Sequence, residues 1–143
     1  MDNLKADILV VDDNTIIHSL FESLGSLHKL NVQCVKNGQK ALDILTEKEF
    51  SLILMDLEMP VMGGLEATRI IRQREKEKQC KRTPIIAISG TIMSNPSLQC
   101  LEAGMDDFIA KPIVMSSVLD VIIPLVKKNS PLEEDSVHSV TEM

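Results

Sequence analysis

Three carboxylates, a hydroxyl and an ammonium group each follow a short apolar run in this sequence. They belong to Asp12 and Asp13 after the first run, Asp56 after the third, Ser89 after the fourth and Lys111 after the fifth. If the runs are parallel strands of one sheet, their carboxyl ends meet at one edge, where open α/β sheets bind ligands. We therefore expect these five side chains to share one site.

The residue types in this group favour one kind of chemistry. Three carboxylates in one site repel one another, by about 4 kcal/mol per pair at ~4 Å and an effective dielectric of ~20. A divalent cation removes this penalty, and all-oxygen ligation suits Mg²⁺, which often bridges to phosphate. One carboxylate can then attack phosphorus and form an aspartyl phosphate. The ammonium and the hydroxyl would stabilise the phosphoryl oxygens in transit, so the residues favour phosphoryl transfer to an aspartate.

Apolar runs alternate with amphipathic stretches along most of the chain, which predicts alternating strands and helices. The expected strands are Ile8–Val11, Val32–Val35, Leu52–Met55, Ile85–Ile88 and Phe108–Ala110. Apolar residues recur at helical spacing at Ile17, Leu20, Phe21, Leu24 and Leu27, at Ala41, Leu42 and Leu45 in a helix from about Gln39 to Lys48, and at Leu65, Thr68 and Ile71. Two further helices are expected, one from Ser94-Asn95-Pro96 with Leu98, Leu101, Met105 and a Gly104 cap, and one over Met115–Lys127.

Two local features qualify these elements. Asn37-Gly38 is expected to form a turn, and Pro124 should kink or shorten the last helix. That helix is apolar around much of its circumference. One side carries Val118, Val121, Ile122 and Leu125, and another carries Leu119, Ile123 and Val126. We expect one of these sides to face the core and the other to be a candidate partner face.

Five strand–helix units predict one doubly wound α/β domain, a flavodoxin-like (βα)5 sandwich over residues 1–128. Parallel strands need right-handed crossovers, which place helices on both faces of the sheet. The expected strand order is 2-1-3-4-5, which makes the first and third strands neighbours. Residues 129–143 are polar and acidic and lack apolar periodicity, so we expect a disordered tail.

Composition excludes several classes of protein. Only 2% of the 143 residues are aromatic, and residues 1–128 hold 15 basic and 17 acidic side chains, so neither stacking nor a basic surface favours nucleic acid. The three widely spaced cysteines predict reduced thiols, without disulfides or a zinc site. No run approaches the ~18 apolar residues of a membrane span, and no signal peptide is evident. We expect a soluble cytoplasmic protein, or a nuclear one if the organism is a eukaryote.

The motifs VVDD, LILMDLEMPVMGG, AISG and AKP, in this order and spacing, resemble the receiver domain of two-component response regulators. The sequence is similar to receivers of hybrid histidine kinases and eukaryotic phosphorelays over about residues 5–128. The resemblance implies that Asp56 is the phosphoacceptor. It also implies that Mg²⁺, with Mn²⁺ able to substitute, is held by Asp13 directly, by Asp12 largely through water, by Asp56 and by the main-chain carbonyl of Glu58.

The resemblance assigns the remaining site residues as well. Ser89 would be a switch hydroxyl that turns toward the phosphate, Lys111 would pair with the phosphate, and Phe108 would be a switch aromatic. Lys111-Pro112 resembles the cis peptide of the family. The domain would take its phosphoryl group from a histidine kinase or a histidine phosphotransfer protein. It would be no enzyme beyond its own phosphorylation and slow dephosphorylation, and it would signal to an output protein or form a homodimer through the face of its fourth and fifth helices.

The sequence departs from the family pattern without losing a chemical group that the reaction needs. Gly63 stands where many members have Asp, Gly90 where Ala is usual, and Pro124 interrupts the last helix. Glu58 and Thr91 occupy variable positions that affect the dephosphorylation rate. These departures leave the lifetime of the phosphorylated state open.

Other interpretations of the same residues stay open at this point. Asp12 and Asp13 could form a solvated turn and helix cap, Phe108 could be a core residue, and His18 is more often a surface helix residue than an acid catalyst. A Mg²⁺-dependent phosphatase with an Asp nucleophile is a rival function, although such enzymes usually have a second Asp where this chain has Glu58. A receiver-like binding module that is never phosphorylated is another rival.

Overall fold

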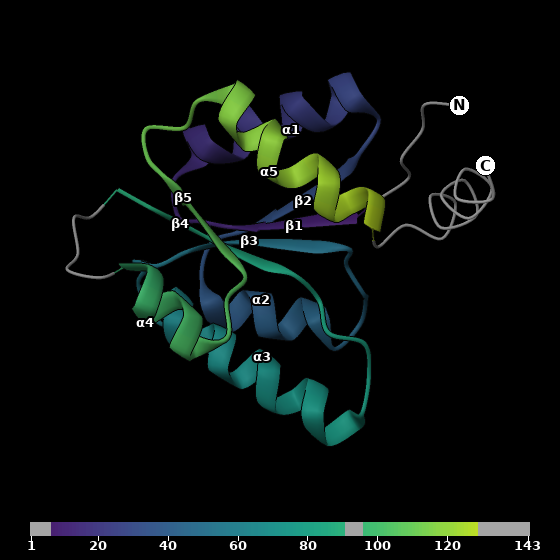
Figure 1. Ribbon diagram of the computed structural model, residues 1–143, viewed down its shortest axis with the longest axis vertical. Coiled ribbons are helices and arrows are strands. Elements are labelled where there is room, and N and C mark those ends of the chain that lie inside the picture. Colours follow the sequence, from purple (N-terminus) through teal and green to yellow (C-terminus); the bar gives the residue numbers. More distant parts are fainter. Residues whose placement is uncertain (1–6, 91–95, 129–143) are drawn as a thin grey trace.

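The computed structural model describes residues 7–90 and 96–128, which form alternating strands and helices (Figure 1). In chain order they are β1 (Asp7–Val11), α1 (Thr15–His28), β2 (Asn31–Val35), α2 (Gly38–Leu45), β3 (Leu52–Asp56), α3 (Gly64–Lys78), β4 (Ile85–Ser89), α4 (Pro96–Ala103), β5 (Asp107–Ala110) and α5 (Met115–Lys128). Every predicted strand is present and is one residue longer than expected. The predictions for Thr91, Ser94, Asn95 and residues 129–143 fall outside the described residues.

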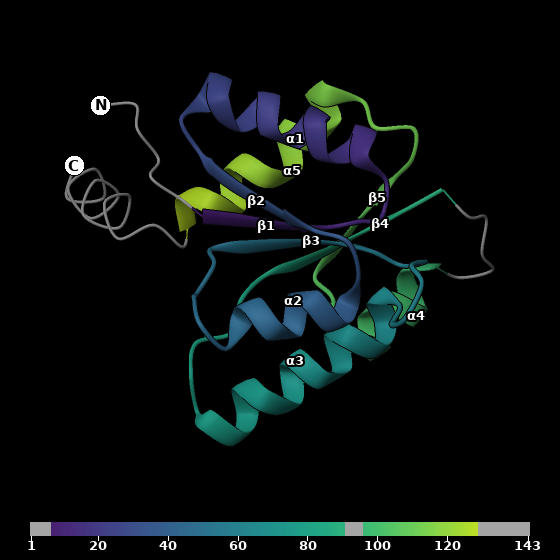
Figure 2. The same cartoon turned by 180° about the vertical axis from the view of Figure 1, so that it is seen from behind.

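All the strands lie in one parallel sheet in the order β2-β1-β3-β4-β5. Helices α1 and α5 cover one face, and α2, α3 and α4 cover the other (Figures 1 and 2). The predicted doubly wound sandwich with strand order 2-1-3-4-5 is therefore confirmed. The chain reverses its direction of travel across the sheet between β1 and β3, which places the ligand-binding edge of such a fold at the carboxyl ends of these two strands.

The central strands are buried on both sides because alternate side chains enter two different cores. In β1, Ile8 and Val10 pack with α1 and α5, whereas Leu9 and Val11 pack with α2 and α3. All residues of β3 and β4 are buried, which explains why these strands read as unbroken apolar runs. Phe21 and Phe50, predicted as core residues, are buried too.

Two asparagines begin helices on the edge of the sheet that carries the site residues. The Asn14 side chain accepts a hydrogen bond from the backbone N–H of Ile16 at 2.8 Å and caps α1. Asn37 accepts from Lys40 at 2.9 Å and caps α2. The sequence predicted a turn at Asn37-Gly38. This prediction is wrong, because Asn37 caps α2 and Gly38 is the first residue of that helix.

The helix ends differ from prediction in two places. Helix α2 stops at Leu45, not near Lys48, and residues 46–47 form a turn. Helix α5 continues to Lys128 past the exposed Pro124, so the expectation that proline shortens this helix is wrong. The fully buried Ile122 and Val126 anchor α5 on both sides of the proline, which outweighs its lost hydrogen bond.

Several leucines at helical spacing face solvent, although their periodicity suggested core positions. Leu27 of α1 is 80% exposed, and Leu98 and Leu101 of α4 are 51% and 68% exposed. On α4 the buried face is formed by Cys100 and Ala103 instead. Gly104 has a φ of 105° directly after this helix, which confirms the predicted glycine cap.

The buried stripe of α5 cuts across the two sides predicted from sequence. Val118, Ile122 and Val126 are fully buried against α1 and the sheet. Leu119 and Leu125, assigned to opposite sides, both pack at the margin of this core. The predicted division of the helix into a core side and a partner side is therefore wrong, because the four-residue spacing of the buried positions fixes a single inward face.

The side chain of Arg72 on α3 makes several hydrogen bonds at the end of the sheet opposite to the predicted site. Its guanidinium donates to the carbonyl oxygens of Gly104 and Thr83, each at 2.8 Å, and to the carboxylates of Glu75 at 2.8 Å and Asp106 at 3.0 Å. Because the Arg72 side chain is only 15% exposed, these bonds are poorly screened by water. One side chain thus links α3 to the segments that lead into β4 and β5.

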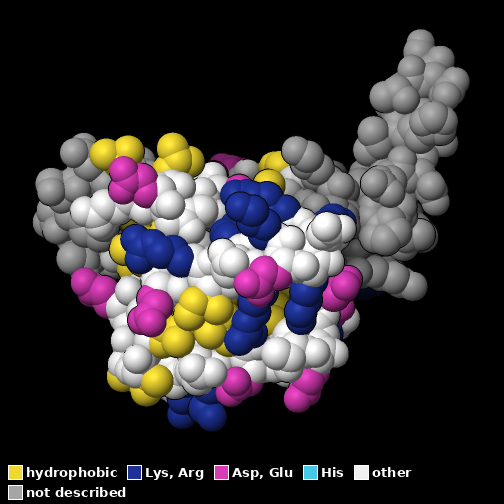
Figure 3. Space-filling view, turned by 90° about the horizontal axis from the view of Figure 1, so that it is seen from below, with side chains coloured by type: hydrophobic (Ala, Val, Ile, Leu, Met, Phe, Trp, Pro, Cys, Tyr) yellow, Lys and Arg dark blue, Asp and Glu magenta, His cyan; other side chains and the backbone are white. Residues whose placement is uncertain are grey.

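The structure also bears on the predictions made from composition. Cys34, Cys80 and Cys100 are free thiols, as predicted. Within residues 7–90 and 96–128, no helix combines the length and apolar character that a bilayer span requires. On the face seen from below, basic and acidic side chains are intermixed around small apolar patches (Figure 3). The described part of that face therefore offers no extended basic stripe for nucleic acid.

Candidate functional site

The predicted site residues converge at the carboxyl edge of the sheet. Asp12 follows β1, Asp56 is the last residue of β3, Ser89 is the last residue of β4, and Lys111 follows β5. These strands are consecutive neighbours in the sheet, so residues far apart in sequence meet there. The expectation that they share one edge of the sheet is confirmed.

Carboxylate oxygens of Asp12, Asp13 and Asp56 lie within 4.8 Å of one another. Asp12 is fully buried, Asp56 is 4% exposed, and Asp13 is exposed. Burial, and then the negative charge of Asp12, raises the pKa of Asp56 from 3.8 to about 6. The cluster therefore carries more negative charge than its surroundings compensate, as a site for a cation would.

Lys111 is the cation nearest to these carboxylates. Its Nζ lies 3.1 Å from Asp12 Oδ2 and 3.6 Å from Asp56 Oδ2. Although burial by itself would lower the pKa of Lys111, contact with Asp12 and the charge of Asp56 raise it. Asp12 Oδ2 is buried and, among the described residues, has no partner in good hydrogen-bond geometry, so this ion pair alone offsets its charge.

The backbone around Asp56 fixes its position closely. Asp56 Oδ1 accepts a hydrogen bond from the backbone N–H of Glu58 at 3.3 Å, and the N–H of Leu57 donates to the carbonyl of Ile88 on β4 at 3.1 Å. A Cβ at Gly64 would collide with the carbonyl oxygen of Asp56. Helix α3 can therefore begin directly beside the Asp56 backbone only because residue 64 is glycine.

The remaining predicted residues lie around this centre. Ser89 is 2% exposed, and its carbonyl accepts from the Lys111 N–H at 2.9 Å. Lys111-Pro112 is a cis peptide, as the resemblance implied. Phe108 is half-buried against the core on the α2 and α3 side, and Glu58 is exposed. Their suggested roles as a switch aromatic and as a carbonyl ligand stay predictions.

Sequence reasoning missed one contact within the site. His18 Nε2 lies 2.6 Å from the carbonyl oxygen of Asp12. The sequence suggested a surface histidine on α1, and the residue is in fact half-buried. Its place in the first turn of a helix that starts three residues after Asp12 was the only available signal, and helical spacing does not say where a ring points.

A cluster of acidic residues with a lysine at the carboxyl edge of such a sheet occurs in more than one class of protein, and comparison with known proteins decides between them. The model of the response regulator receiver domain family matches residues 8–123. The chain belongs to this family.

Relatives of this receiver domain include parts of large signalling proteins. It is 39% identical over 119 residues to hybrid signal transduction histidine kinase G of Dictyostelium discoideum, a match that covers 80% of this chain and 3% of the kinase. It is 36% identical over 120 residues to sensor histidine kinase GacS of Pseudomonas protegens, covering 81% of this chain and 13% of that protein. The receiver domain thus spans a small part of the relatives that it matches.

Solved structures share its fold. The receiver domain of a sensor histidine kinase from Pseudomonas aeruginosa, with a magnesium ion coordinated in its active site cleft, is 30% identical and has a TM-score of 0.74, with coverage of 85% of this chain and 98% of that one. A second solved structure is the receiver domain of Ssk1 from Saccharomyces cerevisiae, crystallised with the histidine phosphotransfer protein Ypd1. It is 30% identical to this chain and has a TM-score of 0.72, with coverage of 87% of this chain and 86% of the solved chain.

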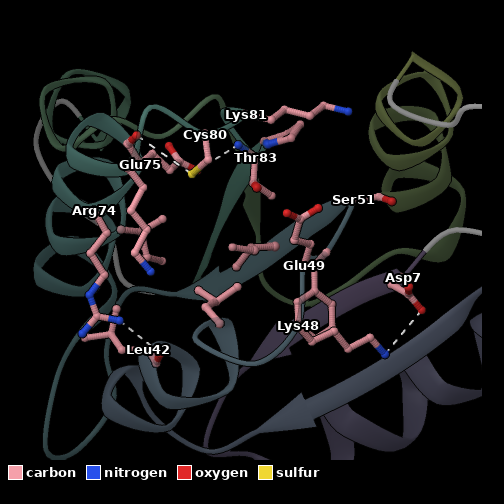
Figure 4. Close-up of a pocket in the computed structure, with 16 residues that line it drawn as sticks. Asp7, Leu42, Lys48, Glu49, Ser51, Arg74, Glu75, Cys80, Lys81 and Thr83 are labelled. Atoms are coloured by element: carbon pink, nitrogen blue, oxygen red, sulfur yellow. Dashed lines mark hydrogen bonds and ion pairs between the residues drawn. The ribbon is translucent and has the colours of Figure 1, made fainter.

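The receiver domain also has a hollow of about 380 Å³ at the other end of the sheet, between the ends of α2 and α3 (Figure 4). Its apolar lining includes Phe50. Around the rim, Lys48 pairs with Asp7 at 3.6 Å, and Arg74 donates to the carbonyl of Leu42 at 3.2 Å. None of the predicted site residues lines it, so it is separate from the acidic cluster.

Proposed function

We propose that this receiver domain accepts a phosphoryl group on Asp56 from the phosphohistidine of a histidine kinase or a histidine phosphotransfer protein. The observation that carries the proposal is the placement of Asp56 beside the carboxylates of Asp12 and Asp13 and 3.6 Å from the Lys111 ammonium. Because the pKa of Asp56 is about 6, most of the molecules carry the nucleophilic carboxylate at pH 7. Membership of the family and the sequence motifs support the same assignment.

The residues around Asp56 fit a magnesium ion. The close carboxylates, the raised pKa of Asp56 and the buried Asp12 Oδ2 without a hydrogen-bond partner together indicate negative charge that a divalent cation would neutralise. Asp12, Asp13, Asp56 and the carbonyl of Glu58 would hold Mg²⁺, with Mn²⁺ able to replace it. When bound, the metal offsets charge on the phosphoryl oxygens during transfer. The magnesium reported for the Pseudomonas aeruginosa receiver supports this assignment.

In the proposed step, a carboxylate oxygen of Asp56 forms a bond to phosphorus while the P–N bond to histidine breaks. The leaving imidazole keeps the electron pair of that bond and takes up a proton. Lys111 compensates charge on the phosphoryl oxygens from its place beside Asp56, and the hydroxyl of Ser89 on the neighbouring strand turns toward the phosphate. Phe108 then moves inward as the switch aromatic, and water later releases inorganic phosphate slowly. The domain is no enzyme beyond these reactions on itself.

Apolar side chains around the site support docking of a protein donor. Ile16, Val61 and Val114 each follow a site residue by a few positions in sequence, and they are 75%, 80% and 55% exposed. Exposed apolar residues near one another mark protein interaction surfaces. The complex of the Ssk1 receiver with Ypd1 supports a phosphotransfer protein as the partner class.

Output would follow through α4, which covers the same face of the sheet as α2 and α3. Leu98 and Leu101 of α4 are exposed apolar residues, which supports the face of the fourth and fifth helices as a contact for an output protein or a homodimer. We place the receiver domain at residues 1–128 and expect it to act in the cytoplasm, or in the nucleus of a eukaryote.

Incubation of the protein with acetyl phosphate and Mg²⁺ tests the phosphoacceptor. Intact-mass analysis should show one added phosphoryl group, which disappears in Asp56→Asn and with EDTA but persists in Asp120→Asn, a control at an exposed carboxylate on α5. Rapid turnover of many phosphate esters would favour the phosphatase. Absence of modification, even with a phosphorylated histidine donor, would favour the binding module.

A further inference from the structure

His18 contacts the acidic loop on both sides of Asp13. Its backbone N–H donates to the carbonyl of Asn14 at 3.3 Å, and its ring Nε2 lies 2.6 Å from the carbonyl oxygen of Asp12. Because the acceptor is a carbonyl oxygen, Nε2 must carry the hydrogen. One residue of α1 therefore contacts the peptide that joins Asp12 to Asp13 through its ring, and the carbonyl of Asn14 through its backbone.

The two acidic residues of the loop differ in how they are held. Every polar atom of Asp12 has a neighbour: its N–H donates to Val35 at 3.1 Å, Oδ1 accepts from Asn14 at 2.9 Å, Oδ2 faces Lys111, and the carbonyl faces His18. The carboxylate of Asp13 is exposed and has no hydrogen bond or ion pair within residues 7–90 and 96–128. Among the described residues, only the position of its backbone is therefore held by the contacts of its neighbours.

We infer that His18 is a positioning residue for cation binding, which orients Asp13 through the peptide that joins it to Asp12. The inference rests on the proposed function, because it concerns the same metal. Without the ring donor, the peptide between Asp12 and Asp13 can rotate, and the Asp13 backbone no longer holds its carboxylate within reach of Asp12 and Asp56. Groups that orient metal ligands usually affect affinity strongly, and a contact that acts through one peptide should have a smaller effect, roughly 3- to 10-fold.

Two amide substitutions at His18 form a matched pair. The Nε2 of Gln is separated from Cα by the same number of bonds as the Nε2 of His, so His18→Gln keeps a donor near the Asp12 carbonyl. His18→Asn has the same amide group one bond shorter and cannot reach. Both variants remove the ring, so a difference between them reports the donor.

Mn²⁺ binding to the full chain tests the inference, with the loss of the free-ion signal in electron paramagnetic resonance as the readout. We expect His18→Asn to weaken Mn²⁺ binding roughly 3- to 10-fold and His18→Gln to stay near wild type. Their free energies of unfolding in metal-free buffer should be similar. Equal affinity of His18→Asn and wild type, or equal loss in both variants, would overturn the inference.

The same series separates the inference from the proposed function. If wild type binds Mn²⁺ and Asp13→Asn does not, the metal site stands, and the two His18 variants decide the role of the ring. If wild type fails to bind Mn²⁺, both proposals fail together. Long-range proton–nitrogen spectra of the metal-free protein give a further readout, because a His18 ring without hydrogen on Nε2 would contradict the contact with Asp12.

Discussion

Replacing Asp56 by Asn should stabilise the metal-free protein. Burial and the Asp12 charge raise the pKa of Asp56 from 3.8 to about 6, and each unit of such a difference corresponds to about 1.4 kcal/mol. The ionised carboxylate therefore costs the folded state up to about 3 kcal/mol at neutral pH. Asn has nearly the same shape and no charge. Since the surroundings relax in part, we expect Asp56→Asn to raise the free energy of unfolding by roughly 1–3 kcal/mol at pH 7.5.

The pH dependence gives this prediction a definite sign. In the unfolded chain Asp has a pKa of about 3.9, so below about pH 4 the side chain is protonated in both states and carries no penalty. As the pH rises toward 6, the unfolded chain loses its proton first, and the stability of wild type falls. The advantage of Asp56→Asn should thus be largest above pH 6, shrink as the pH falls and vanish near pH 4.

Urea unfolding in EDTA, followed by far-UV circular dichroism because the chain has no Trp or Tyr, measures these free energies. Asp120→Asn removes an exposed carboxylate and serves as the control, with an expected change within about 0.5 kcal/mol. The reasoning fails if Asp56→Asn is no more stable than wild type at pH 7.5. It also fails if the advantage is the same at pH 4, because the charge of the buried Asp56 carboxylate would then not be its source.

Further predictions concern the frame around the site. Arg72→Met keeps the alkyl stem but removes four hydrogen bonds and leaves the Thr83 carbonyl and Glu75 Oε1 without a donor, whereas Gly104 and Asp106 keep bonds from Arg82 and Ile85. It should therefore lower the free energy of unfolding by about 2–4 kcal/mol in urea titrations. Gly64→Ala should abolish phosphorylation by acetyl phosphate or destabilise the fold by about 3 kcal/mol, because its Cβ has no room. Cys34, whose pKa is raised to about 11 mainly by burial and also by a neighbouring glutamate, should react with iodoacetamide at pH 8 at least about 100-fold more slowly than the exposed Cys80.

Each of these predictions has its own control. Gly90→Ala is the counterpart of Gly64→Ala, because a Cβ at Gly90 meets only ordinary contacts at 3.4 Å, and loss of function there would contradict the steric explanation. Arg69→Met changes an exposed arginine on the same helix, and an equal loss of stability in both variants would show that the buried bonds do not matter. Rapid alkylation of Cys34, read by mass spectrometry, would show that its thiol is not protected.

The sequence predicted which residues share one edge of the sheet, because the strands specify where their ends lie. An unbroken run such as Ile85–Ile88 suits only a covered parallel strand, and such strands bring residues like Asp56 and Lys111 to one edge. Periodicity was less informative on the helices, since it could not tell that Leu101 faces solvent while Ala103 is buried. The contacts of Arg72 with Gly104 and Asp106 depend on where distant segments meet, which no local pattern encodes. The contact of His18 with Asp12 spans only six residues, but it depends on the direction of the ring, which helical spacing does not specify.

The assembly of the site from the ends of neighbouring strands has a consequence for newly made chains. Asp12 and Lys111 are 99 positions apart in the sequence, and they meet only when the whole parallel sheet has formed. Parallel pairing of distant segments forms late, because the closure of long loops must precede it. A nascent or misfolded chain therefore lacks the reactive centre, and only molecules that have completed folding can take part in signalling. The parallel topology thus restricts phosphorylation to chains that have finished folding.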